Sequence, residues 1–129
     1  MFPMEFIRFE SPIPNGRGAY IGIFGMANGL ARQDLLSSQD REWLATSNAW
    51  GDAAYVDPAT VDATIFDKTV YPIATCWFKS TAEHLLVQAS GYLDLLDRYG
   101  VKWRERRSAD PGRPIYEDDV QVVVVPHPV

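Results

Sequence analysis

Apolar and polar residues change their spacing several times along the chain, and each change predicts an element. Residues 5–10 are aromatic and β-branched, which is typical of a short strand. Residues 11–18 contain two prolines and two glycines and are predicted to form a loop. Residues 19–36 carry apolar side chains in almost every register and predict a helix. We expect another backbone to pack closely on the face that holds its glycines, which are Gly22, Gly25 and Gly29.

Two helix starts can be recognised in the middle of the chain. Ser37 or Ser38 can cap a helix, because Asp40 follows Ser37 at the spacing of a capping box. Asp57 and Pro58 form a second start, with an aspartate cap and a proline in the first helical position. The β-branched residues that follow predict that this second helix is only one or two turns long.

The next segment allows two interpretations. Apolar residues over 72–89 recur at helical spacing, which favours one continuous helix that begins at the proline. The alternative makes residues 73–78 a strand and lets Ser80 cap a later helix. In either case Ser90 and Gly91 predict a break, followed by a short helix that ends at Gly100 in the left-handed cap position.

After residue 100 the period changes to two. Residues 101–107 alternate and predict a strand, and residues 108–114 predict a turn. Residues 114–126 predict a hairpin with a tight acidic turn and a second strand that is nearly all apolar, and so central to a sheet. The fold class is therefore α+β: an N-terminal strand, several central helices and a C-terminal antiparallel hairpin that we expect to pair with the first strand.

The composition of the chain excludes several classes of protein and of metal site. The 129 residues fit a single domain, and 47% of them are hydrophobic, enough for a core. The longest apolar run, residues 120–125, is far shorter than the roughly 20 residues of a membrane helix. The chain has one cysteine and two histidines, Cys76, His84 and His127, so no internal disulfide, cysteine-based zinc site or three-histidine centre is available. The N-terminus lacks the pattern of a secretory signal, and we expect a cytoplasmic protein.

Charge is distributed unevenly. The chain carries a formal charge of −5, but residues 98–113 hold six basic residues against two acidic ones. That window is therefore +4 and the rest of the chain is −9, which disfavours non-specific nucleic-acid binding. Within the window, a basic stripe alternates along the predicted strand and could bind phosphate or carboxylate: Lys102, Arg104 and Arg106, with Arg107 at its edge.

The basic stripe also has a purely structural interpretation, which we favour. Glu117, Asp118 and Asp119 lie in the next turn and could pair with the stripe across the hairpin. These three acids could also supply oxygen ligands to a cation. Because neighbouring residues of a strand point to opposite faces, we predict no metal site there.

A second candidate anion site is the loop over residues 11–18. It holds Asn15 and Arg17, with Tyr20 shortly after, and backbone amides at the start of a following helix can bind an anion. The loop does not match a dinucleotide-binding motif or a P-loop, and a plain structural loop is the favoured interpretation.

One order of residues points to an enzyme. Arg8, the pair Ser80-Thr81 and Glu117 follow one another along the chain. This order resembles that of mono-ADP-ribosyltransferases, which are α+β proteins, although it covers only those positions and no continuous motif. The resemblance implies NAD as substrate, with Arg8 on the pyrophosphate, a hydroxyl on the nicotinamide ribose and Glu117 stabilising the developing oxocarbenium ion.

These observations favour a non-catalytic binding or assembly module. The apolar strand over 120–125 and the glycine face of the helix over 19–36 fit self-association into a homo-oligomer, and a protein or small-molecule partner is the other expectation. The first alternative is an enzyme that acts on an anionic small molecule, most specifically an ADP-ribosyltransferase-like protein. The second is phosphate or nucleic-acid binding through residues 102–107.

Overall fold

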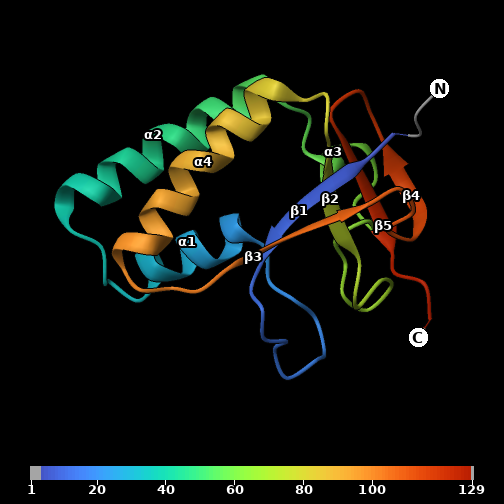
Figure 1. The fold of residues 1–129 in the computed structure, drawn as a ribbon, viewed down its shortest axis with the longest axis horizontal. Helices are drawn as coiled ribbons and strands as arrows, with labels where there is room; N and C mark the ends of the chain where they lie inside the picture. Colours follow the sequence, from blue (N-terminus) through green and yellow to red (C-terminus); the bar gives the residue numbers. More distant parts are fainter. Residues whose placement is uncertain (1–3, 129) are drawn as a thin grey trace.

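The computed structural model describes residues 4–128, which form an antiparallel sheet with helices packed beside it (Figure 1). The sheet has five strands in the order β3-β1-β2-β5-β4: β1 (Phe6–Glu10), β2 (Thr75–Lys79), β3 (Arg104–Ser108), β4 (Arg113–Glu117) and β5 (Gln121–Val125). The helices are α1 (Ile23–Arg32), α2 (Ser38–Ala54), α3 (Pro58–Val61) and α4 (Glu83–Arg98). The predicted α+β class is confirmed.

Local chemistry explains where three helices begin or end. The Ser37 hydroxyl accepts a hydrogen bond of 3.1 Å from the Asp40 N–H and caps α2. The Asp57 carboxylate accepts one of 3.0 Å from the Ala59 N–H and caps α3. Gly100 has φ of +70° just after α4, a backbone conformation that glycine adopts without a steric penalty. The caps and the helix end predicted at these positions are confirmed.

The favoured continuous helix over 72–89 is wrong, and the alternative strand is correct. Residues 75–79 form β2, which lies between β1 and β5. Trp77 and Phe78 are both buried, in separate clusters on opposite sides of the sheet. A strand that is buried on both faces loses its alternation, and its apolar residues can then also fit a helical stripe. Ser80 does not cap α4, because the capping position is Ala82 and no side chain bonds there.

Gly91 does not end a helix, as was predicted, but lies inside one. Helix α4 continues through Ser90 and Gly91, so the predicted break is wrong. The glycine makes room for α2 instead, because a Cβ at Gly91 would lie 2.6 Å from Cζ2 of Trp43. Of the three glycines predicted to allow a close approach, Gly22 forms a bridge with the backbone of Glu10 just before α1, whereas the nearest atoms to a Cβ at Gly25 and Gly29 belong to side chains of α1 and its flank.

The pairing of the strands corrects the expected arrangement of the sheet. The hairpin of β4 and β5 forms and β5 is central, as predicted, but its inner neighbour is β2 and not β1. Strand β1 pairs instead with β3 and β2. Because β5 is paired on both sides, it offers no edge to a second copy, and this strand no longer supports self-association.

The larger core lies between the sheet and the helices. It joins α1, α2 and α4 to Phe78 of β2 and contains Ile23, Leu44, Leu95 and Leu96. A smaller cluster on the other side of the sheet consists of Trp77, Val122 and Val124, with Phe6 against them. Within residues 4–128, no helix combines the length and the apolar character needed to cross a bilayer.

The packing of α2 on α4 generates a prediction with opposite signs for two glycines. Replacing Gly91 with Ala should lower the free energy of unfolding by about 1–2 kcal/mol, because the new methyl group overlaps the Trp43 ring. Replacing Gly29 with Ala should raise it by up to about 1 kcal/mol, since that Cβ meets only ordinary contacts and alanine favours a helix. Urea denaturation of both variants measures the difference. Stabilisation by both substitutions would contradict the packing described here.

Candidate functional site

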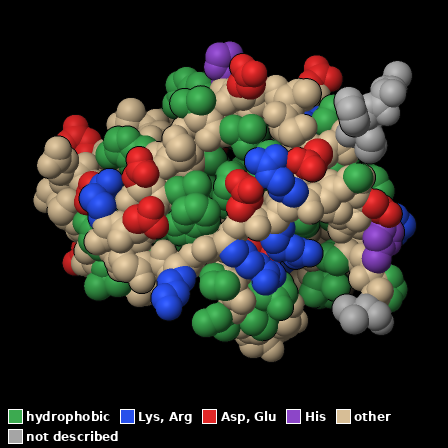
Figure 2. Space-filling model, viewed as in Figure 1, with side chains coloured by type: hydrophobic (Ala, Val, Ile, Leu, Met, Phe, Trp, Pro, Cys, Tyr) green, Lys and Arg blue, Asp and Glu red, His purple; other side chains and the backbone are tan. Residues whose placement is uncertain are grey.

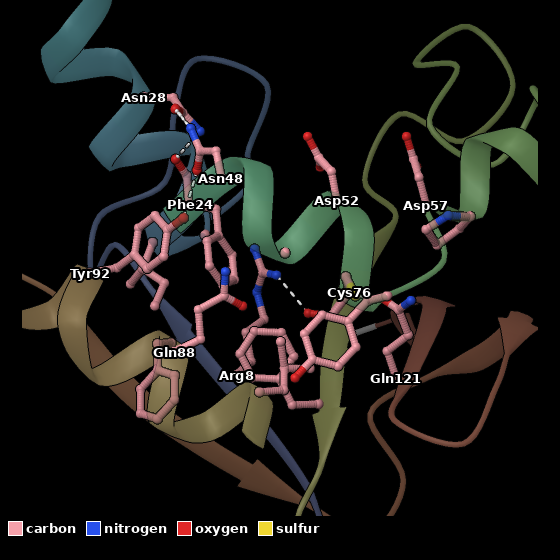
Figure 3. A pocket seen from close by; sticks show the side chains of 18 of the residues that line it. Arg8, Phe24, Asn28, Asn48, Asp52, Asp57, Cys76, Gln88, Tyr92 and Gln121 are labelled. Atoms are coloured by element: carbon pink, nitrogen blue, oxygen red, sulfur yellow. Dashed lines mark hydrogen bonds between the residues drawn. The ribbon is translucent and has the colours of Figure 1, made fainter. Parts of the chain in front are cut away.

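A cavity of about 460 Å³ lies between the helix side of the sheet and the helices (Figure 3). Strands β1 and β2 contribute Arg8, Cys76 and Phe78, and the segment that joins α2 to α3 contributes Tyr55 and Asp57. Helices α1, α2 and α4 supply the rest of the wall, with Gln121 of β5 beside them. Cavities of this size accommodate small organic ligands in other proteins.

Aromatic rings form one part of the wall. The ring centroids of Phe24 and Tyr92 lie 4.5 Å apart, and those of Phe24 and Phe78 lie 5.9 Å apart, both in edge-on geometry. Leu85 of α4 adds an aliphatic surface, and it is 6% exposed. Tyr92 is fully buried, so this wall is set by core packing and its shape does not depend on a ligand.

A chain of amide groups crosses the top of the cavity. The Tyr92 hydroxyl donates to Asn48 Oδ1 at 2.6 Å, and Asn48 Nδ2 donates to Asn28 Oδ1 at 2.8 Å. Asn28 Nδ2 in turn donates to the Phe24 carbonyl at 2.9 Å, and Gln88 Nε2 donates to the Ser47 carbonyl at 3.0 Å. Figure 3 shows these side chains converging on one side of the cavity. The bonds hold the amides in fixed orientations, as recognition of a ligand requires.

Tyr55 is the exception among the polar groups of the wall. Its hydroxyl oxygen is buried and has no hydrogen-bond partner among the described residues. Burial raises the pKa of the Tyr55 hydroxyl above its ordinary value of 10.0. A buried hydroxyl without a partner costs free energy, which a ligand atom that bonds to it would recover.

Arg8 lies at the base of the cavity, and each of its three nitrogens donates a hydrogen bond within the protein. Its Nη1 donates to the Cys76 carbonyl at 2.8 Å and its Nη2 to the Tyr20 carbonyl at 2.6 Å. Its Nε donates to the carboxylate of Glu10 at 2.7 Å, and Glu10 is only 1% exposed. The positive charge of Arg8 is therefore compensated by Glu10 and is not available to a ligand in the cavity.

Two carboxylates lie among the residues that line the cavity. Asp52, near the end of α2, and Asp57, before α3, are exposed and are drawn in Figure 3 with their carboxylates directed the same way. Since Arg8 is paired with Glu10, the cavity has a negative balance of charge. An anionic ligand would meet repulsion there, whereas a neutral or cationic one would not.

The Cys76 thiol is protonated at neutral pH and is a poor nucleophile. Burial raises the pKa of its thiol to about 12, and the thiol donates to Gln121 Oε1 at 3.3 Å. Gln121 Nε2 donates to the carbonyl of Val56 at 2.8 Å and to Asp118 at 3.1 Å, so this glutamine ties β5 to the segment beside α3. Residues 4–128 contain no group of three metal-ligating side chains.

The residues suggested by the resemblance to ADP-ribosyltransferases do not meet at this cavity. Arg8 lines it, but Glu117 of β4 lies outside it and forms an ion pair of 2.7 Å with Lys79. Ser80 and Thr81 belong to the turn between β2 and α4, and neither lines the cavity with Arg8.

Asn15 and Tyr20, two of the residues predicted for an anion site in the loop, make contacts within the protein. Asn15 Oδ1 accepts from the N–H groups of Arg17 at 2.9 Å and Ala19 at 3.1 Å, which closes the turn. Tyr20 lies under Arg104, whose Cζ is 4.5 Å from the ring centroid. None of these groups lines the cavity.

Arg104 and Arg106 of the basic stripe pair with Glu10 and not with the acids that were predicted. Arg104 bonds to Glu10 at 2.7 and 3.1 Å, and Arg106 approaches the same carboxylate at 3.5 Å. Arg107 pairs with Glu5 and Glu105, and Lys102 precedes β3. The predicted pairing with residues 117–119 is wrong, because β3 and β4 occupy opposite edges of the sheet.

Sequence reasoning missed most of the cavity. Asn48 and Gln88 are polar residues on helix faces that otherwise point to the core, and this contrast was the available signal. Tyr55 and Gln121 carried no signal, because their place depends on the packing of distant elements.

Comparison of the chain with models of protein families, with curated proteins and with solved structures finds no match.

The environment of Cys76 predicts slow chemistry. With a pKa of about 12, against an ordinary value of 9.0, the thiolate fraction at pH 8 is about a thousandfold lower than in the unfolded chain. We expect a disulfide reagent to label the native protein at least that much more slowly than the protein in urea. The native rate should rise with pH, because the thiolate population grows. Rapid labelling of the native protein at pH 8 would contradict the buried thiol.

Glu10 generates a prediction for stability. Replacing Glu10 with Gln leaves the buried Arg8 without its counter-charge, and we expect the free energy of unfolding to fall by about 3 kcal/mol or more. The matched control is Glu105→Gln on the neighbouring strand, an exposed site where a change within about 0.5 kcal/mol is expected. Urea denaturation at neutral pH compares the two. Equal stability of both variants would show that the buried pair is not needed.

Proposed function

We propose that this protein is a non-catalytic binding module that holds a small, neutral or cationic organic molecule in the cavity between its sheet and its helices. The observation that carries the proposal is the buried Tyr55 hydroxyl, which has no partner in the described structure, on a residue that lines a cavity of about 460 Å³. Buried polar groups without partners are rare in native proteins, and a ligand is one way to satisfy them.

The rest of the wall supports the same class of ligand. Phe24, Phe78 and Leu85 provide an apolar surface for the body of the molecule. The amides of Asn28 and Gln88 each use one Nδ2 or Nε2 hydrogen bond within the protein and have further capacity for polar atoms of the ligand. Asp52 and Asp57 favour a positive group over a negative one.

Binding fits these side chains better than catalysis does. The thiol of Cys76 has a pKa of about 12 and bonds to an amide rather than to a base. The Tyr92 hydroxyl, whose pKa burial raises to about 12, donates to Asn48. Neither group is activated as a nucleophile or a general base would be. An enzyme acting on an anion would also need a positive charge, and the charge of Arg8 is already paired with Glu10. The composition of the chain is also the reason why we propose a cytoplasmic protein.

Replacing Tyr55 with Phe tests the proposal because stability and binding should respond differently. The hydroxyl makes no bond within the described protein, so the free energy of unfolding should stay constant or rise by up to about 1 kcal/mol. A neutral or cationic fragment found by a thermal-shift screen of the wild type should bind the variant about tenfold more weakly, as expected for one lost hydrogen bond. Calorimetry measures both affinities.

The matched control is Tyr92→Phe, which removes a hydroxyl that does have a partner. It should destabilise the protein by about 1 kcal/mol, because Asn48 loses the bond of 2.6 Å. If Tyr55→Phe destabilises as much as the control, the hydroxyl has a structural role. If no uncharged or cationic fragment stabilises the wild type, or if fragments bind the variant equally well, the proposal is wrong.

A further inference from the structure

Arg104 and Arg106 form a basic patch on the sheet, here called the arginine patch, at a separate place from the cavity. Both belong to the edge strand β3 and point toward Glu10 of β1. They remain 38% and 47% exposed, whereas Glu10 is 1% exposed. Figure 2 shows basic side chains gathered near the centre of the face on which β3 crosses β1 in Figure 1, next to hydrophobic ones.

The patch has more positive charge than its own acid can balance. Arg8, Arg104 and Arg106 all approach the single carboxylate of Glu10, which leaves a local excess of two positive charges. The acids that were expected to complete the balance, Glu117 and its neighbours, lie on the opposite edge of the sheet. The excess is therefore presented to the surroundings.

The guanidinium groups are also held in place. Arg104 lies over the Tyr20 ring at 4.5 Å and Arg106 over the Trp77 ring at 5.2 Å, measured from Cζ to the ring centroid. Glu10 anchors Arg104 by two hydrogen bonds. Most of the N–H groups of the two arginines have no partner in the described residues, and fixed guanidinium forks suit the two oxygens of a carboxylate.

The exposure of the patch indicates a large partner. A lone anion on an open surface gains little from two arginines, because water screens the charges. A macromolecule that covers the patch excludes this water and strengthens the pairs. A nucleic acid carries a phosphate at every nucleotide along its length, so it would meet the −9 of the chain outside residues 98–113, whereas a short acidic segment need cover only the patch. An acidic segment of a protein is the remaining complementary surface.

The loop beside the patch supports a protein partner. It runs from the end of β1 to α1 and contains Tyr20 of the patch, and it leaves Ile13 71% exposed and Ile21 44% exposed. Arginine and aromatic residues next to apolar side chains are typical of protein interfaces. We propose that the arginine patch binds acidic side chains of a partner protein, with the loop over residues 11–21 as the apolar part of the same interface.

The test uses a fluorescent peptide of alternating Glu and Thr as the probe and the whole protein as the receptor. Fluorescence anisotropy should show binding at low salt that weakens as salt rises. Replacing Arg104 and Arg106 together with Gln should weaken binding about tenfold, because two charged pairs are lost. The control, Arg32→Gln with Arg113→Gln, makes the same change in net charge at exposed sites elsewhere and should bind as the wild type does.

Folding of the variants is checked by urea denaturation. If the double variant is unstable, Arg106→Gln alone is used, since its contact with Glu10 is the longer one at 3.5 Å, and a loss of about threefold is expected. Equal weakening in the control pair would show a general effect of charge and overturn the proposal. So would tighter binding of a single-stranded oligonucleotide through the same arginines, or the absence of peptide binding. Tyr55→Phe should leave peptide binding unchanged, so failure here is separate from failure of the cavity proposal.

Discussion

The buried carboxylate of Glu10 holds together the arginines of two neighbouring strands. A carboxylate that is 1% exposed must have counter-charges, and here Arg8 and Arg104 supply them at 2.7 Å each. Arg8 lies directly opposite Arg106 in the pairing of β1 with β3, an arrangement that would be repulsive without the acid between them. Glu10 thereby allows β1 and β3 to pair despite their facing arginines.

Arg8 extends this constraint to the place where β1 and β2 separate. Strands β1 and β2 are paired only at Phe6 with Lys79 and at Ile7 with Phe78. Beyond these pairs the Arg8 guanidinium bonds to the carbonyls of Cys76 and Tyr20, and so joins β1 to β2 and to the loop before α1. The cavity begins at this point, with a base whose charge is already neutralised.

One acid thus separates two surfaces with different chemistry. On the helix side, the charge of Arg8 is compensated and the remaining groups are aromatic rings, amides and the Tyr55 hydroxyl, which suits uncharged or cationic molecules. On the exposed side, Arg104 and Arg106 share an acid that Arg8 already uses, and their excess charge suits an acidic partner. Both proposals rest on this balance of charge.

Features that depend on neighbouring residues were predictable from the chain alone: the caps at Ser37 and Asp57, the left-handed Gly100, the hairpin of β4 and β5, and the α+β class. The choice between helix and strand over 72–89 required the packed fold, because a strand buried on both faces shows no alternation. It alone brought Glu10 to the basic stripe and Tyr55 to the cavity. Those contacts join residues far apart in the chain, and residue type and spacing carry no information on which distant partners the packing selects.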